Sequence, residues 1–124
     1  MKKKLTIIMF TYDKEKLNYG LSIICAAAAI DRPTEFFFAG ENVYNILNLD
    51  YLKKINKSSF LSFSNTEELL QSSLELGTIF IVCSAAIESK KIDVKFIRQD
   101  LKVSISGLVS ILSEEKENKE LLFI

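Results

Sequence analysis

The chain has 124 residues, of which 48% are hydrophobic, and its 16 basic and 16 acidic side chains give a formal net charge of zero. This length and composition predict one domain with a real core over residues 1–124, and the charge balance argues against binding nucleic acid or an anionic membrane. The chain has no histidine, which excludes Ser-His-Asp and Cys-His catalysis and most zinc sites.

Two apolar segments near the N-terminus are too short to act as targeting or membrane segments. Residues 5–10 follow a basic start, as in a signal peptide, but they run into charged residues with no small-residue cleavage site. Residues 20–30 are too few to span a bilayer. We therefore expect a cytoplasmic protein. Its two cysteines are also too few for a disulfide scaffold.

The first predicted unit is a strand followed by a long helix. Residues 4–10 form an apolar run typical of a strand buried on both faces. Asp13 is a favourable N-cap for a helix over residues 14–30. One side of this helix should face the sheet, namely Leu17, Leu21, Ile24 and Ala28. The opposite side carries small residues, including Cys25, and is interpreted either as a subunit contact or as an exposed face.

The second predicted unit begins with a phenylalanine-rich strand over residues 34–39. Gly40 ends it, and a short helix over residues 41–49 follows, with its inward side formed by Val43, Ile46 and Leu47. Residues 50–63 are interpreted as a helical turn and a loop covering the sheet edge. The pattern from Ser64 to Glu67 is a capping box, which predicts a helix ending near Gly77.

The C-terminal half continues the alternation of strands and helices. Strands are predicted over residues 78–83, 101–106 and 121–124. Helices are predicted from residue 84 to about 91 and over residues 107–117, the latter with Leu108, Ile111 and Leu112 inward, and residues 113–120 should be solvated. This order predicts right-handed βαβ units in a three-layer α/β/α domain, with a mostly parallel sheet of roughly five strands.

Several chemistries are excluded by the absence of their motifs. The four glycines are too far apart for a phosphate-binding loop, and no Cys-x-x-Cys dithiol exists. A phosphate-cradling thiol loop would end in an arginine where Ser89 and Lys90 stand, and a receiver domain would need an aspartate at the position of Cys83. We expect neither a metal nor a cofactor.

Cys83 is the most informative residue, because it ends an apolar strand and precedes a helix. Ligands bind at this edge of open α/β sheets, near the strand ends at Thr11, Asp13 and Gly40. A helix terminus stabilises an anion by only about 0.3–1 kcal/mol, so strong activation of the thiol needs more. The candidates for this are the Ser84 hydroxyl, the N–H groups of Ala85 and Ala86, and the cations Lys90, Lys91 and Arg98. Cys83 is thus either a reactive thiol or a small core residue.

The order of these elements resembles the DsrE/DsrF-like family of small sulfur-relay proteins, over nearly the whole chain. The segment from Gly77 to Ala86, Gly-Thr-Ile-Phe-Ile-Val-Cys-Ser-Ala-Ala, is similar to the family's cysteine-bearing strand and turn. Further similar segments are Lys3–Ile8, the alanine-rich helix around Ile24–Ile30, Phe36–Phe38, Ser104–Leu112 and Leu122–Ile124. The charged segment after Cys83 and residues 50–63 depart from the family's pattern.

The resemblance implies a sulfur carrier that accepts sulfane sulfur as a persulfide on Cys83 and passes it on. Our hypothesis adds that Ser84 and the N–H groups of Ala85 and Ala86 stabilise the thiolate or the persulfide. The resemblance also implies homo-oligomers, trimers or hexamers, and sulfur donor and acceptor proteins as partners. Two alternatives remain open. One is a non-catalytic oligomeric binding module of the same fold. The other is a peroxiredoxin-like thiol protein, in which Cys25 would be the intramolecular resolving thiol.

Overall fold

The computed structural model describes residues 2–113 and 118–124, which form a three-layer α/β/α fold around one parallel sheet. The strands are β1 (Lys4–Met9), β2 (Thr34–Phe38), β3 (Ile79–Cys83), β4 (Ser104–Ser106) and β5 (Lys119–Phe123). The α-helices are α1 (Lys14–Ala29), α2 (Leu49–Lys54), α3 (Ser64–Glu75), α4 (Ser84–Ser89) and α5 (Leu108–Leu112). Four 3₁₀ helices connect them: η1 (Gly40–Ile46), η2 (Phe60–Ser62), η3 (Val94–Phe96) and η4 (Gln99–Leu101).

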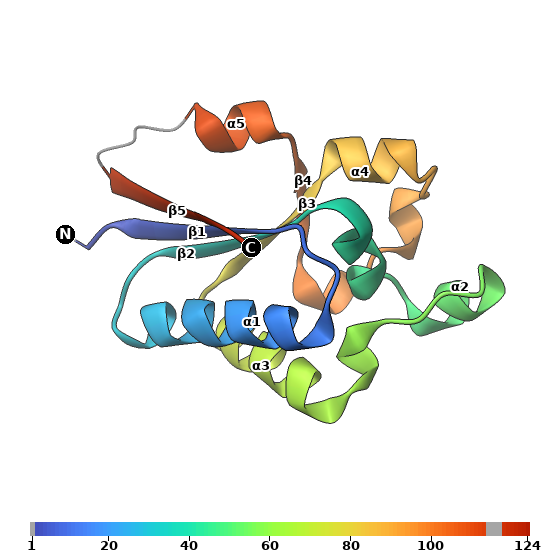
Figure 1. Ribbon diagram of the computed structural model, residues 1–124, viewed down its shortest axis with the longest axis horizontal. Coiled ribbons are helices and arrows are strands. Elements are labelled where there is room, and N and C mark those ends of the chain that lie inside the picture. The colour runs from blue at the N-terminus through green and yellow to red at the C-terminus, as the bar shows by residue number, and fades with distance from the viewer. Residues whose placement is uncertain (1, 114–117) are drawn as a thin grey trace.

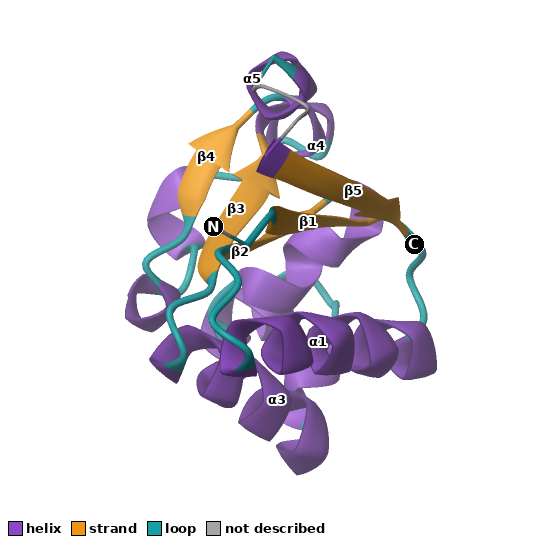
Figure 2. Cartoon of the chain, turned by 90° about the vertical axis from the view of Figure 1, so that its left-hand side faces the viewer, coloured by secondary structure: helices purple, strands orange, loops and turns teal. Residues whose placement is uncertain are grey.

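The sheet has the strand order β4-β3-β2-β1-β5, and every neighbouring pair is parallel. Helices α1 and α3 cover one face, whereas α4 and α5 lie over the other (Figures 1 and 2). The predicted fold class is thereby confirmed. Because all strands run the same way, their carboxyl ends meet at one edge of the sheet.

The core follows from the apolar runs in the sequence. All residues of β2 are buried, and the ring of Phe36 contacts those of Phe38 and Phe80 on the side covered by α1. The side of α1 predicted to face the sheet is buried throughout. Gly20 allows this close packing, since a Cβ there would lie 3.2 Å from the sulfur of Met9.

The opposite side of α1 contacts α3 of the same chain. The ammonium of Lys14 lies 4.1 Å from the ring centre of Phe63, and Thr66 donates a hydrogen bond of 2.6 Å to Asn18. These contacts are made by Lys14 and Asn18, whereas the small residues Ser22 and Ala29 on this side are exposed, in line with one of the two interpretations. Cys25 is half-buried on this helix.

The predicted capping box is wrong. Ser64 is already inside α3, and the N-cap is Phe63, whose side chain makes no capping hydrogen bond. Glu67 instead binds Arg98, 31 residues away in the sequence. The other end of α3 agrees with prediction, because Gly77 follows it with a φ of 97° that favours glycine.

The C-terminal elements are shorter than predicted. Lys102 has a φ of 52°, which interrupts the extended chain and restricts β4 to three residues. Helix α5 has five residues and buries Ile111, while Leu108 and Leu112 are exposed, contrary to prediction. The rest of the predicted helix, residues 114–117, lies outside the described residues. Lys119, expected in a solvated segment, begins β5 with a buried side chain.

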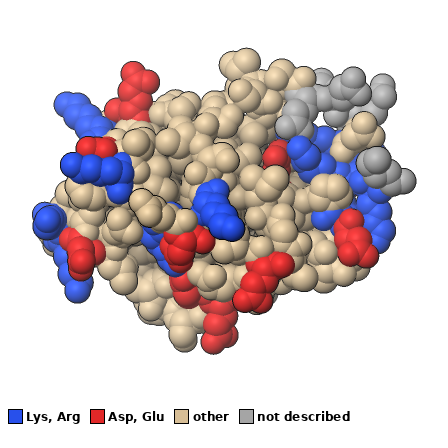
Figure 3. Space-filling model, turned by 180° about the vertical axis from the view of Figure 1, so that it is seen from behind, with Lys and Arg blue, Asp and Glu red and all other residues tan. Residues whose placement is uncertain are grey.

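The surface agrees with the balanced charge of the sequence. The face in Figure 3 shows acidic and basic side chains interspersed among uncharged ones. Within residues 2–113 and 118–124, we find no helix of the length and hydrophobicity that a bilayer crossing needs.

Candidate functional site

The fold brings the predicted site residues to the carboxyl edge of the sheet. Thr11 and Asp13 follow β1, Gly40 follows β2, and Cys83 ends β3. Asp13 is engaged as the N-cap of α1, accepting a hydrogen bond of 2.9 Å from the Lys16 amide. Gly40 has a φ of 58°, and a Cβ there would lie 3.0 Å from the ring of Phe10. Phe10 therefore covers this part of the edge.

Cys83 is the N-cap residue of α4 and belongs to the core, with 6% of its surface exposed. The Cys83 side chain makes no capping hydrogen bond to the first amide groups of α4. Ser84 and Ala85 are exposed, whereas Ala86 is buried. The Ser84 hydroxyl packs near Gly107, at the start of α5.

Two of the three cations considered for Cys83 have other partners. Arg98 binds Glu67 and Asp100. The Lys90 ammonium lies 5.5 Å from the ring centre of Tyr44. Lys91 is exposed just after α4, in a left-handed conformation. Of the groups considered, the start of α4 is therefore the one that the structure places directly beside Cys83.

The two cysteines lie on opposite sides of the sheet. Phe80 contacts Phe36, which faces α1, the helix that carries Cys25. Side chains alternate along a strand, so Cys83, three residues after Phe80, points to the other face. This placement disfavours a Cys25–Cys83 disulfide and with it an intramolecular resolving role for Cys25.

Hydrogen bonds of two buried asparagine side chains, Asn42 and Asn45, form a network at the carboxyl edge of the sheet. The Asn42 amide group donates hydrogen bonds to the carbonyl oxygens of Met9 (3.2 Å) and Thr11 (3.0 Å). Its own oxygen accepts from the Asn45 amide at 2.9 Å. The Asn45 oxygen in turn accepts from the Phe60 N–H at 2.8 Å. The network fixes the loop after β1 to η1 and to the segment before η2.

Tyr12 packs against the same region at the protein surface. Its ring packs on that of Phe60 with centroids 4.6 Å apart, and its hydroxyl donates to the Ser58 carbonyl at 3.3 Å. Burial raises the pKa of Tyr12, and the nearby carboxylate of Glu41 raises it further. The phenol therefore stays protonated at neutral pH and acts as a hydrogen-bond donor.

A groove of about 740 Å³ lies beside this edge, and sequence reasoning missed it. Residues of η1, α2, η2, α3 and the segment from η3 to η4 line it, including Asn45, Asn48, Tyr51, Leu61, Glu67, Phe96, Arg98 and Asp100. Of the residues predicted for the Cys83 site, Arg98 lines the groove, whereas Cys83, Ser84, Ala85, Ala86, Thr11, Asp13 and Gly40 do not. Its residues come from segments far apart in the sequence, so no local motif indicated it.

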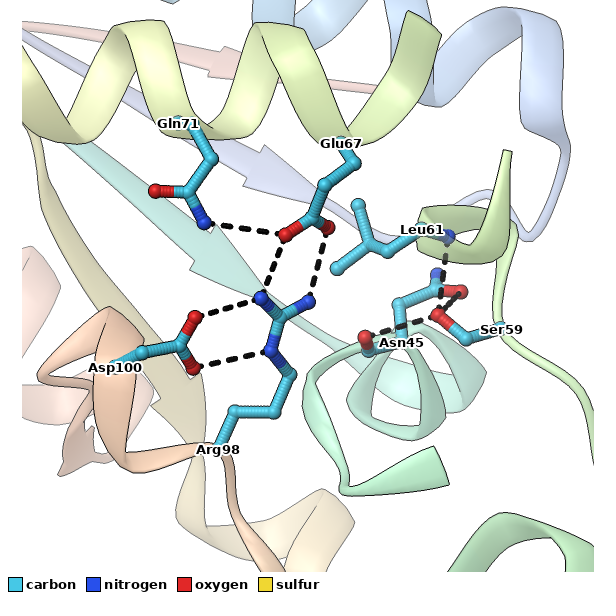
Figure 4. Close-up of polar contacts among 7 residues, drawn as sticks. All are labelled: Asn45, Ser59, Leu61, Glu67, Gln71, Arg98 and Asp100. Atoms are coloured by element: carbon cyan, nitrogen blue, oxygen red, sulfur yellow. Dashed lines mark hydrogen bonds and ion pairs between the residues drawn. The ribbon is translucent and has the colours of Figure 1, made fainter. Parts of the chain in front are cut away.

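Arg98 is held at the groove by two carboxylates (Figure 4). Its guanidinium donates to both Glu67 oxygens at 2.9 and 2.6 Å, and to both Asp100 oxygens at 3.1 and 2.7 Å. Bidentate pairs of this kind are strong and geometrically specific. They fix the segment after η3 against α3.

Arg98, Glu67 and Asp100, here called the Arg98 triad, shift one another's pKa values. Hydrogen bonding to Arg98 is the main cause that lowers the pKa of Glu67, and it lowers that of Asp100 as well. The bonds to Glu67 are the main cause that raises the pKa of Arg98. Both carboxylates therefore stay ionised at neutral pH, against one guanidinium.

We expect the stability of the fold to fall in acid partly through Glu67. Its pKa is lower in the folded than in the unfolded chain, so its contribution is complete above the unfolded value and is lost as the pH falls through the folded value. Urea midpoints measured between pH 7 and pH 3 should fall less steeply in Glu67→Gln than in the wild type. Glu68→Gln, an exposed neighbour on α3, is the matched control and should retain the wild-type slope. Equal slopes in all three proteins would contradict this role.

These features define the class of protein: an α/β/α protein with a five-stranded parallel sheet, a thiol at the carboxyl end of β3 and a polar groove beside that edge. Its fold is similar to that of ychN from E. coli, with a TM-score of 0.69 and 18% identity over 100% of both chains. It is also similar to MTH1491 from Methanobacterium thermoautotrophicum, a protein of unknown function (TM-score 0.68, 17% identity, 99% of this chain and 100% of that one). BT1422 from Bacteroides thetaiotaomicron, a conserved protein of unknown function, is similar too (TM-score 0.68, 14% identity, 98% and 95%). No protein-family model and no curated protein match the sequence.

Proposed function

We propose that the protein is a cytoplasmic sulfur carrier that accepts sulfane sulfur on Cys83 and passes it to a partner thiol. The observation that carries the proposal is the position of Cys83 at the carboxyl end of β3, as the N-cap of α4. The amides at the start of α4 would stabilise a thiolate or a persulfide anion. The resemblance of Gly77–Ala86 to the cysteine segment of the DsrE/DsrF-like family supports the same role.

The proposed chemistry is an exchange between sulfur atoms. The Cys83 thiolate attacks the outer sulfur of a donor persulfide, forming one S–S bond and breaking another, and the donor leaves as a thiolate. An acceptor thiolate then attacks the outer sulfur on Cys83 in the same way and regenerates the Cys83 thiolate. Each step forms and breaks one S–S bond, so no external oxidant is needed. Since Cys83 is only 6% exposed, loading requires local opening around the start of α4.

Intact mass after incubation with thiosulfate or a cysteine persulfide tests this proposal. The wild type should gain the mass of one sulfur atom, and Cys83→Ser should gain none, because it lacks the nucleophile. Cys25→Ser is the matched control and should load as the wild type does, since Cys25 lies on the other side of the sheet. A Cys83→Ser variant that still loads at Cys25, or a wild type that takes up no sulfur, would contradict the proposal.

The burial of Cys83 favours a second candidate, a non-catalytic binding module that presents the carboxyl edge to a small anion or a partner protein. In that case the thiol belongs to the core and contributes packing only. Native alkylation with iodoacetamide separates the two functions. Modification of Cys83 only when the protein unfolds favours the module, whereas modification of the folded protein favours the carrier.

We further propose a homo-oligomer, a trimer or hexamer, as the family resemblance implies. Supporting it, α5 and β5 expose apolar side chains, namely Leu108, Val109, Leu112, Leu121 and Phe123. Exposed apolar surface of this kind is typical of interaction sites. Sedimentation velocity at micromolar concentration should give a species larger than the monomer, and Val109→Lys should dissociate it. A monomeric wild type would contradict the proposal.

A further inference from the structure

The groove beside the carboxyl edge has the dimensions and lining of a ligand site. Pockets that bind small molecules usually measure roughly 300–1,000 Å³ and combine apolar walls with a few polar groups. This groove, at about 740 Å³, has the apolar side chains of Leu47 and Leu61 in its lining. Its polar groups include the Arg98 triad and the exposed side chain of Asn48.

The charges of the residues that line the groove favour a positively charged ligand. The lining contains three carboxylates, of Asp50, Glu67 and Asp100, and two cations, Lys54 and Arg98, which leaves one negative charge in excess. Arg98 is shared by two carboxylates, so it is not free to bind an anion. The Asp100 side chain is 54% exposed, so its carboxylate remains accessible to a second cation.

A pair of stacked aromatic side chains favours a ligand with a flat ring. The rings of Tyr51 on α2 and Phe96 on η3 are stacked, with centroids 4.0 Å apart and planes inclined by 10°. Both residues line the groove. The Lys95 ammonium already lies 5.2 Å from the ring centre of Phe96, so the ring of Tyr51 is the one proposed to contact a ligand. Aromatic rings favour flat rings by stacking and favour cations through their negative faces.

We propose that this groove binds a small organic cation with a flat aromatic body, paired with Asp100 and packed beside Tyr51. The site is independent of sulfur transfer at Cys83, which does not line it. Cys83→Ser should therefore bind the ligand as the wild type does, and a failure of either proposal leaves the other intact.

The test uses three probes of the same size and different charge, each titrated into ¹⁵N-labelled protein and followed by amide chemical shifts. Benzamidinium should bind, with shifts at groove residues. Neutral benzamide should bind at least about fivefold more weakly, and benzoate should not bind, because the groove has an excess negative charge. Methylguanidinium, which carries the charge without the ring, should also bind more weakly. Equal binding of benzamidinium and benzamide, or shifts spread over the whole surface, would overturn the proposal.

Matched variants locate the interaction. Asp100→Asn should weaken benzamidinium about five- to tenfold. Asp31→Asn is the control, because Asp31 is an exposed aspartate just after α1 that does not line the groove. Tyr51→Leu leaves the Arg98 triad untouched and should also weaken binding, whereas Tyr19→Leu on exposed α1 should not. Unchanged affinity in both Asp100→Asn and Tyr51→Leu would overturn the proposal even if benzamidinium binds elsewhere.

Discussion

Replacing Asn42 with aspartate is expected to destabilise the fold by about 3–4 kcal/mol, although the two side chains have the same shape. Asn42 is fully buried, and its amide group donates to two carbonyl oxygens, those of Met9 and Thr11. An ionised carboxylate cannot donate, and it would face both carbonyl oxygens in a site without water contact. Thermal or urea unfolding at pH 7 measures the loss.

The acid dependence of Asn42→Asp gives a second readout. A protonated carboxyl group regains one donor, so the loss should shrink as the pH falls toward the unfolded-state value of about 4 and stay constant below it. Asn48→Asp is the matched control, because Asn48 is exposed, and its stability should change by less than about 0.5 kcal/mol. A loss in Asn42→Asp no larger than in Asn48→Asp would show that the network does not hold the carboxyl edge.

The strands were predictable because a strand buried on both faces is a continuous run of apolar residues in the sequence. The apolar runs predict β1, β2 and β3 to within one residue at each end. The N-cap role of Asp13 was predictable as well, since its partner is three residues away. The buried strands and the start of α1 depend on neighbours in the sequence, and these can be seen without the fold.

The charged contacts were not predictable, because their partners are distant in the sequence. Glu67 has the spacing of a capping box, and only the fold shows that it binds Arg98. The groove arises from the same long-range pairing. One local signal was available: Asn42 and Asn45 are three residues apart in a segment predicted to be helical with an apolar inward side. Two amides on one helical face near buried positions indicate a buried polar network.

The ion pair between Glu35 and Lys119 also joins residues that are distant in the sequence, and it is the basis of the second large expected effect. Glu35 is a buried carboxylate in the middle of the sheet, 4% exposed, and it accepts a hydrogen bond of 2.7 Å from Thr6. Its oxygens lie 3.3 Å from the ammonium of Lys119 and 3.6 Å from that of Lys4. Lys119 is as buried as Glu35, and it also donates to the Ile111 carbonyl at the end of α5.

Lys119→Met is expected to destabilise the fold by about 3 kcal/mol. The substitution keeps the apolar stem but leaves the buried Glu35 carboxylate with the more exposed Lys4 as its remaining cation among the described residues, and breaking a buried ion pair costs several kcal/mol. It also removes the donor to the Ile111 carbonyl, which loosens α5. Urea unfolding at pH 7 measures the change.

The double variant Glu35→Gln/Lys119→Met separates the lost pair from the lost packing. Removing both charges should recover most of the stability, since a neutral glutamine can still accept from Thr6 and no longer needs a cation. Lys95→Met is the surface control, because Lys95 and its partner Asp93 are both exposed (70% and 53%), and it should cost less than about 1 kcal/mol. If the costs of Glu35→Gln and Lys119→Met were simply additive, the two charges would be uncoupled. The buried carboxylate would then be held by Thr6 and Lys4, and Lys119 would act only on α5.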